Sequence, residues 1–213
     1  MRLLVAFMCL LAGCLAQKPQ PCASPALLTG AFTVATQNEK LWIYCTYEYD
    51  ALGQRIRLRQ QGTYQTKPFT NDFLLLFREG AVYQIFDTNR TCIKSALKDK
   101  FHPMEIPKNA SLLGQAVVGS SSAPGQGLLV NTWTGDMPDK KGKYMTTFTE
   151  FGCIPVSNSY QTDEYGWVVS NFFNNVIGIV DPSQLNLPDF CVDKVMKTDG
   201  EPLTFLSLFH NLP

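Results

Sequence analysis

Apolar and polar residues alternate along much of this chain with a period of two, the period of a β-strand. Between Leu41 and Tyr49 every odd position is apolar or aromatic, whereas the even positions become polar at Thr46 and Glu48. Residues at odd and even positions of a strand project from opposite faces. The pattern therefore predicts a strand that buries its odd-numbered face.

Two β-hairpins follow from the same pattern. Turn residues at 50–53 precede an alternating run at 55–59, which places three arginines on one face that we expect to meet solvent. Apolar runs at 73–77 and 81–86 flank a short polar turn and predict a second hairpin. Three further runs rich in β-forming residues predict strands, at 128–133, 143–151 and 167–180.

Signals for helices are few. Short helices are expected within 182–195 and 202–209, because each segment begins with a proline, which suits a first helical position. The segment 103–107 has prolines at both ends and predicts an extended connector. The run 119–125 is short enough to be an exposed loop within one domain.

Two of the predicted strands are apolar on both faces, at 73–77 and at 167–169. An antiparallel sheet usually has one face in the core and one in water, so something must cover the second face of these strands. A second sheet, a helix or a dimer partner would cover it. A curved sheet around an apolar cavity would also explain the pattern.

The first sixteen residues have the features of a secretory signal peptide. Arg2 precedes a nearly unbroken apolar run, and small residues near Ala16 suit cleavage before Gln17. The run is too short to span a membrane, and no later segment is long and apolar enough to do so. We therefore expect signal peptide 1–16 and a single secreted domain, 17–213.

Charge and motif content exclude several classes of function. Lys plus Arg and Asp plus Glu number 18 each, so no net field attracts nucleic acid. The chain has two histidines, and it contains neither a nucleophile-elbow motif nor a complete dinucleotide-binding glycine pattern. We therefore expect a protein that is not an enzyme and has no organic cofactor.

Five cysteines remain after the predicted cleavage, in a compartment where disulfides persist. Five thiols can form two bridges in about fifteen ways, and spacing alone does not choose among them. The remaining thiol is either buried or available to join two chains.

Two sequons, at Asn89 and Asn109, can accept N-glycans in this compartment and would then lie on the surface. Calcium is a possible ligand, because loop carboxylates and carbonyls can bind it without a linear motif. For the candidate acids Asp136, Asp163 and Asp181, a solvated loop position is the simpler interpretation, and the metal-binding residues stay unknown.

The chain resembles the ependymin and ependymin-related proteins over nearly all of its mature length. None of the shared segments has a chemical mechanism of its own, but their order and spacing are specific. They are Pro21-Cys22, Tyr49-Asp50, 54–57, 77–85, 92–94, 106–111, 152–156, 172–173 and 178–182.

The resemblance implies a mainly β fold, in which curved antiparallel sheets form a half-barrel similar to bacterial lipoprotein carriers. It implies an apolar pocket that binds hydrophobic molecules or lipids, few short helices and a homodimer. It also implies a secreted or lysosomal glycoprotein linked to calcium and to matrix adhesion. An adhesion or signalling glycoprotein that acts through its surface, its glycans and calcium is the alternative function.

The resemblance further implies disulfides between Cys22 and Cys153 and between Cys92 and Cys191, which leaves Cys45 as the candidate for an interchain bridge. If the Cys45 strand is buried within one subunit, its thiol is instead a small core residue. From the predicted strands we expect a pocket wall of Phe73, Leu75, Phe77, Trp133, Phe148, Trp167 and Phe172.

Overall fold

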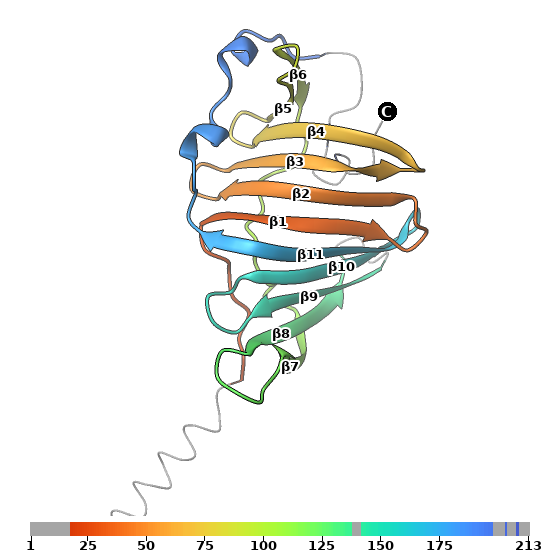
Figure 1. The fold of residues 1–213 in the computed structure, drawn as a ribbon, viewed down its shortest axis with the longest axis vertical. Coiled ribbons are helices and arrows are strands. Elements are labelled where there is room, and N and C mark those ends of the chain that lie inside the picture. The colour runs from red at the N-terminus through yellow and green to blue at the C-terminus, as the bar shows by residue number, and fades with distance from the viewer. Residues whose placement is uncertain (1–17, 138–141, 198–202, 204–207, 209–213) are drawn as a thin grey trace, which may run out of the picture.

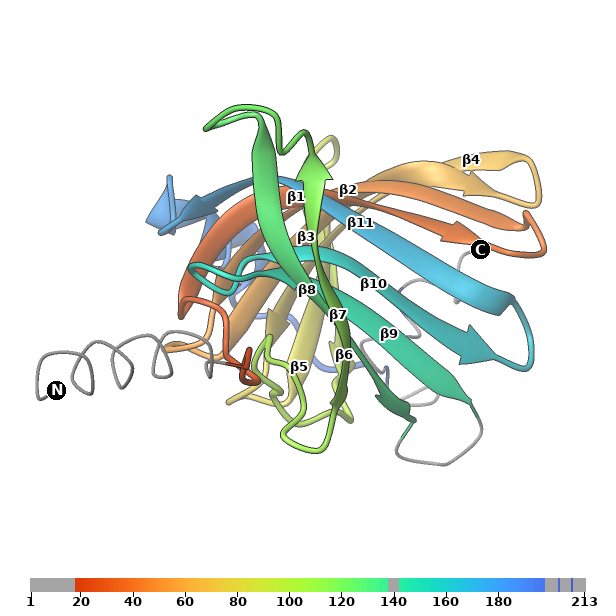
Figure 2. The ribbon, with the colours of Figure 1, turned by 90° about the horizontal axis from the view of Figure 1, so that it is seen from below.

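A single antiparallel sheet of eleven strands, strongly curved, dominates the computed structural model (Figures 1 and 2). The structure describes residues 18–137, 142–197, 203 and 208, so the predicted signal peptide and most of segment 202–209 lie outside it. The strands are β1 (Leu27–Thr36), β2 (Leu41–Asp50), β3 (Arg55–Tyr64), β4 (Lys67–Leu76), β5 (Ala81–Phe86), β6 (Thr91–Ala96), β7 (Ser111–Gly119), β8 (Gly127–Asp136), β9 (Lys143–Thr149), β10 (Pro155–Thr162) and β11 (Gly166–Ile177).

The sheet consists of two meanders joined side by side. Its order is β6-β5-β4-β3-β2-β1-β11-β10-β9-β8-β7, so the first and last strands pair at its centre. The two predicted hairpins and the three further strands are confirmed. Strands β1, β6, β7 and β10 were not predicted. Glycines interrupt the apolar alternation at position 30 in β1 and position 114 in β7.

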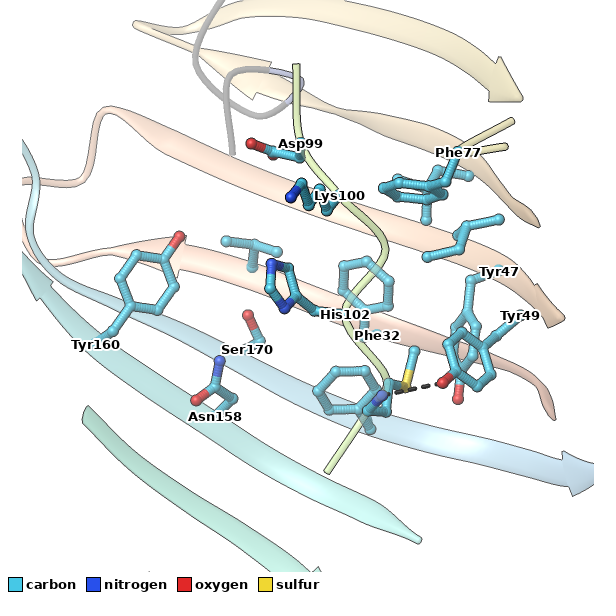
Figure 3. A pocket seen from close by; sticks show the side chains of 15 residues that line it. Phe32, Tyr47, Tyr49, Phe77, Asp99, Lys100, His102, Asn158, Tyr160 and Ser170 are labelled. Carbon is cyan, nitrogen blue, oxygen red and sulfur yellow. Dashed lines mark hydrogen bonds between the residues drawn. The ribbon is translucent and has the colours of Figure 1, made fainter. Parts of the chain in front are cut away.

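The two faces of the sheet have different coverings. The inner face carries the odd residues of β2 and the even residues of β3, and its buried cluster includes Leu41, Ile43 and Leu58. The connection between β6 and β7, residues 97–110, crosses this face, and we call it the strap (Figure 3). The mainly β, half-barrel fold is thus confirmed. The core lies on the concave face of one curved sheet, and the strap covers it.

The outer face of β3 is only partly solvated at its arginines, which corrects the prediction: Arg57 is buried, and Arg55 and Arg59 are about one-third exposed. Arg57 is buried and donates two hydrogen bonds to the Asp72 carboxylate, at 2.9 and 2.7 Å. Its third bond, at 2.7 Å, goes to the carbonyl of Gln184, which lies in a C-terminal segment packed over the face. Neither the acidic partners nor this covering segment can be read from the alternation within β3.

The predicted helical segment 182–195 contains two short 3-10 helices, η1 (Pro182–Leu185) and η2 (Asp189–Cys191). Asp181 caps η1 by accepting hydrogen bonds from the Ser183 backbone N–H and hydroxyl, at 3.0 and 2.7 Å. Segment 103–107 contains no helix or named strand, as predicted for a connector, and forms one isolated bridge, between Glu105 and Ala23.

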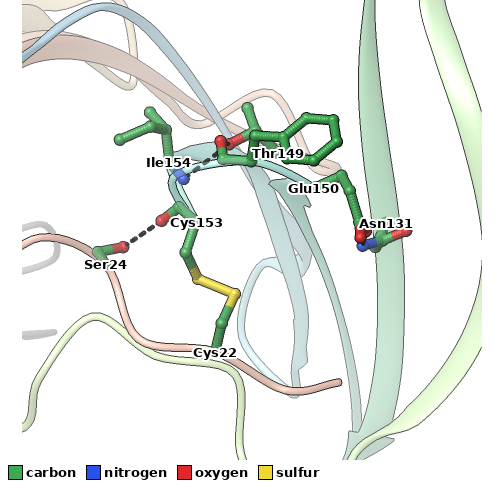
Figure 4. Close-up of a disulfide and its surroundings, with 8 residues drawn as sticks. Cys22, Ser24, Asn131, Thr149, Glu150, Cys153 and Ile154 are labelled. Carbon is green, nitrogen blue, oxygen red and sulfur yellow. Dashed lines mark hydrogen bonds between the residues drawn. A yellow bond between two sulfur atoms is a disulfide. The ribbon is translucent and has the colours of Figure 1, made fainter. Parts of the chain in front are cut away.

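The N-terminal segment connects the strap to the meander formed by β7 to β11. The backbone N–H of Ile106 donates to the Cys22 carbonyl, at 2.9 Å, and that of Ser24 donates to the Met104 carbonyl, at 2.8 Å. Cys22 forms a disulfide with Cys153, and the Ser24 hydroxyl donates to the Cys153 carbonyl (Figure 4). These contacts hold the middle of the strap at a fixed height above the sheet.

Candidate hydrophobic ligand site

A cavity of about 330 Å³ lies between the inner face of the sheet and the strap (Figure 3). Most of its wall is aromatic or aliphatic and comes from strands β1, β2, β3 and β11, from the turn after β4 and from the strap. These lining residues are Phe32, Val34, Tyr47, Tyr49, Ile56, Leu58, Phe77, Met104 and Phe172. An enclosed apolar space with few polar groups is typical of a site for small hydrophobic ligands.

Strand register brings the aromatic wall together. Phe32 of β1 faces Cys45 of β2, and the next inner pair along the strands is Gly30 with Tyr47. Because Gly30 has no side chain, the Tyr47 hydroxyl can donate to Asn175 Oδ1 of β11, at 2.7 Å. The rings of Phe32 and Phe172 are 5.2 Å apart, so aromatic contacts join β1 and β11 beside the cavity.

The strap supplies the roof and the charged rim. The Phe101 ring lies 5.9 Å from the Tyr49 ring and 5.3 Å from the Phe77 ring, which holds the roof against the sheet. The backbone N–H of Met104 donates to the Tyr49 hydroxyl, at 3.0 Å. Asp99, Lys100 and His102 follow along the strap at the edge of the cavity. The ionisable lining residues therefore all come from the strap, and the wall that the strands supply is uncharged.

Three polar side chains project into one end of the cavity: Asn158 and Tyr160 from β10, and Ser170 from β11 (Figure 3). Burial raises the pKa of Tyr160 to about 12, so its hydroxyl is protonated at neutral pH. Asn158 and Tyr160 also line a second cavity of about 580 Å³, as do Met104 and Phe172. The two cavities therefore share a wall beneath the strap.

Several predicted wall residues line these cavities. Phe77 and Phe172 line the first, and Phe148 and Phe172 line the second. Phe73 and Leu75 have the same parity as Phe77, but they lie within the buried cluster of the inner face and do not line either cavity.

Two tryptophans lie elsewhere. Trp133 packs against Phe148, Ile106 and Cys153 in a separate buried cluster. Trp167 lies outside both cavities. No bulge separates it from Phe172 in the pairings of β11 with β10 and β1, so an odd number of steps puts the two on opposite faces.

Sequence reasoning missed the strap and most of the inner-face residues of β1 to β3. Alternation in the predicted strands already placed Tyr47 and Tyr49 on one face and Ile56 and Leu58 on another. Pairing the two strands of the hairpin puts these two groups on the same face of the sheet, so the alternation was sufficient to predict these inner-face residues. The strap residues have no periodicity, so the sequence carries no comparable signal for them.

Both disulfides implied by the resemblance are present, Cys22 with Cys153 and Cys92 with Cys191. Cys45 is a free cysteine with no exposed surface, in the core of the inner face. Burial and the nearby Glu48 carboxylate both raise the pKa of its thiol. An interchain bridge would need β2 to open, so the structure favours the interpretation of Cys45 as a small core residue.

The sequons lie at different ends of the molecule. Asn89 is exposed in the turn between β5 and β6, and its Oδ1 accepts a hydrogen bond from the Thr91 hydroxyl, at 2.6 Å. Asn109 is exposed at the end of the strap, on the wall of the second cavity. Within the described ranges, no three His, Cys, Asp or Glu side chains gather to hold a metal ion.

The part of the chain that the structure describes has no helix of the length and apolar character needed to cross a membrane. A solved structure of an uncharacterized conserved protein from Thermus thermophilus has a similar fold, with a TM-score of 0.51 and 10% identity. The match covers 84% of this chain and 91% of that one.

Sequence comparisons cover nearly the full chain. Ependymin-1 of Oncorhynchus mykiss is 33% identical over 97% of this chain and 95% of its own length. Ependymin-2 of Carassius auratus is 31% identical over 98% and 97%. The family model described as Ependymin matches residues 65–191. The chain belongs to the ependymin family.

Proposed function

We propose that this protein is a non-enzymatic carrier or sensor of hydrophobic small molecules or lipids, which it holds between the curved sheet and the strap. The observation that carries the proposal is the apolar cavity beneath the strap, which five strands and the strap enclose. Its walls supply rings and aliphatic side chains, and its charged residues stand only on the strap.

The hydrophobic effect would supply most of the affinity. Each Å² of apolar surface removed from water contributes roughly 25 cal/mol, so a ligand that buries about 200 Å² gains roughly 5 kcal/mol. Strand pairing fixes the wall that the sheet supplies. The strap is held over it by the hydrogen bond from the Met104 N–H to the Tyr49 hydroxyl and by the contact between the Tyr49 and Phe101 rings. A preformed site of this kind spends little binding energy on ordering itself.

We further propose that the protein is secreted or delivered to the lysosomal lumen, as a homodimer with N-glycans at Asn89 and Asn109. The exposure of both asparagines supports glycosylation. Calcium binding and matrix contact belong to the alternative proposal of an adhesive glycoprotein, in which the surface and the glycans act rather than the cavity.

Adjacent phenylalanines on β11 provide a matched test. Phe172 lines the cavity, whereas Phe173 points to the opposite face, where its ring lies 6.0 Å from the Tyr44 ring. Wild type, Phe172→Gln and Phe173→Gln would be secreted from animal cells, and their organic extracts would be compared by mass spectrometry. We expect one lipid class to be enriched with wild type and Phe173→Gln, and at least tenfold depleted with Phe172→Gln.

Equal lipid content in the two folded variants would contradict the cavity as the binding site. If wild-type protein holds no enriched lipid and retains none after incubation with candidate lipids, the carrier proposal is wrong. Binding to matrix proteins that depends on calcium or on Asn89 and Asn109 would then support the adhesive alternative.

A further inference from the structure

We propose that Asn158, Tyr160 and Ser170 form a recognition site for an uncharged hydrogen-bonding group, such as a hydroxyl or carbonyl, at the end of an apolar ligand. The inference rests on the proposed function and specifies its ligand class: neutral amphiphiles, in preference to hydrocarbons or to charged amphiphiles.

Strand pairing places the three side chains together. Asn158 of β10 lies directly opposite Ser170 of β11 in the antiparallel register, and Tyr160 is two positions further along β10 on the same face. All three line the first cavity, and Figure 3 shows them grouped at one end, across from Tyr47 and Tyr49. They form a polar end to a wall that is otherwise apolar.

The polar atoms of this group are available to a ligand. Over the described ranges, no side-chain hydrogen bond is formed by Asn158, Tyr160 or Ser170. The other two tyrosines of the cavity differ, because the Tyr47 hydroxyl donates to Asn175 and the Tyr49 hydroxyl accepts from the Met104 N–H. All three residues are partly exposed, so their polar groups face the open space of the cavity, where a hydrogen-bonding group of a ligand can replace water.

The chemistry of the three side chains favours a neutral partner. The Asn158 amide and the two hydroxyls can each donate and accept, so they suit a hydroxyl, a carbonyl or an amide. A carboxylate or an ammonium would need a counter-ion to offset its desolvation, and none of these three side chains is charged. The ionisable residues of the cavity, Asp99, Lys100 and His102, all belong to the strap, and the first two are adjacent and opposite in sign.

The position of the site also limits the shape of the ligand. Asn158 and Tyr160 belong to the wall that the two cavities share. A ligand whose polar group binds there places its apolar body against Phe32, Leu58 and Phe77 in the first cavity. Any larger substituent beyond the polar group can extend into the second.

Three fluorescent probes of nearly equal shape would test the inference. They are 9-methylanthracene, 9-anthracenemethanol and 9-anthracenecarboxylate, titrated into the full-length secreted protein. The test variant is Asn158→Leu/Ser170→Ala. The control is Ser159→Ala, because Ser159 lies between the two β10 residues but projects from the opposite face, with its hydroxyl 3.4 Å from the Met145 carbonyl. Circular dichroism would show that both are folded.

We expect wild type and Ser159→Ala to bind the alcohol more tightly than the methyl or carboxylate probe. The preference for the alcohol over the methyl probe should fall by about five- to tenfold in Asn158→Leu/Ser170→Ala, as loss of a neutral hydrogen bond predicts. The methyl probe should still bind that variant.

Two results would overturn the inference while leaving the proposed function intact. One is an alcohol preference that is unchanged in Asn158→Leu/Ser170→Ala, and the other is tightest binding of the carboxylate probe to wild type. If none of the three probes binds a wild type that does retain lipid in the extraction test, this inference is wrong and the carrier proposal stands. If the protein retains neither probes nor lipid, both proposals are wrong.

Discussion

Gly30 shows how a single residue shapes the cavity floor. A β-carbon at this position would collide with Asn175 Oδ1 and lie 3.0 Å from the Tyr47 ring. Asn175 in turn donates to the Pro155 carbonyl, at 3.1 Å, so the Gly30 gap supports a chain of contacts from β2 through β11 to the start of β10.

Gly30→Ala should therefore lower the free energy of unfolding by about 1–3 kcal/mol, since overpacking displaces the Tyr47 hydrogen bond. The control is Gly114→Ala in β7, where a β-carbon would meet nothing within 4 Å and stability should change by less than about 0.5 kcal/mol. Urea denaturation measures both. Equal effects at the two glycines would contradict the close packing at Gly30.

The Cys45 thiol should be unreactive in the native protein. Burial and Glu48 raise its pKa, and the thiolate is the reactive form, so the protein should exclude iodoacetamide from Cys45 at pH 8. Alkylation should become complete after unfolding in guanidinium chloride, as mass spectrometry would show. Rapid alkylation of the native protein would contradict the burial of Cys45, whereas a Cys45-dependent dimer on non-reducing gels would support the interchain bridge.

The side-chain faces could be predicted from the sequence only in part. Alternation groups Tyr47 with Tyr49 and Phe73 with Phe77, but it does not say which group faces the cavity. Trp167 and Phe172 were assigned to one wall although five steps separate them, and the regular register of β11 puts them on opposite faces. The sequence shows which residues of a strand share a face. Which of them line the cavity depends on the curvature of the sheet and on the strap, and the sequence pattern shows neither.

At the scale of elements, a row of ion pairs links β2, β3 and β4 on the outer face. Arg55 pairs with Asp50, Arg57 with Asp72, and Arg59 with Glu48. Two of these arginines also donate hydrogen bonds to the η1 segment. Arg55 donates to the Leu185 carbonyl and Arg57 to the Gln184 carbonyl. Burial disfavours the charge of Arg57, but the bonds to Asp72 outweigh it and raise the Arg57 pKa.

Arg57→Met should cost about 3 kcal/mol of stability, because it leaves the Asp72 carboxylate partly buried without its main partner. Lys143→Met breaks the ion pair between Lys143 and Asp136. Both side chains are about 70% exposed, so this change should lower stability by less than about 1 kcal/mol. Thermal and urea unfolding would be compared for the two. A similar small loss in both would show that the Arg57–Asp72 pair contributes no more to stability than an exposed pair.

The arginine row also shows why an element can be predicted while its surroundings cannot. The alternation over 55–59 predicted a strand and its two faces from local sequence. The covering of the outer face comes from residues 184 and 185, more than 120 positions away. Local periodicity contains no information about a contact of that range.

At the scale of the whole molecule, two disulfides tie the terminal segments to the sheet, with different relations to the strap. Cys22–Cys153 closes a separation of 131 residues and packs against Ile106 of the strap, whereas Cys92–Cys191 closes one of 99 residues between the edge strand β6 and η2. In the chain-entropy model each contributes roughly 4–5 kcal/mol. The two bridges should therefore contribute similarly to the free energy of unfolding, but only Cys22–Cys153 should affect ligand affinity.

Replacing both cysteines of a bridge by alanine would separate these effects. Each double variant should lose roughly 4–5 kcal/mol of stability, by guanidinium denaturation. At a temperature where both stay folded, Cys22→Ala/Cys153→Ala should bind 9-anthracenemethanol at least fivefold more weakly, because the strap loses its anchor. Cys92→Ala/Cys191→Ala should bind like wild type. Equal affinities would show that the strap holds its position without the bridge.

The pairing of β1 with β11 determines when the cavity can exist. Hairpins within each meander connect neighbours in sequence, but this central pairing joins residues about 140 positions apart and must overcome the entropy of closing that long loop. During synthesis on the ribosome, β1 to β10 emerge before the strand that carries Ser170 and Phe172. A nascent chain therefore has no finished cavity, and the carrier proposal implies that ligand loading waits until translation has passed β11.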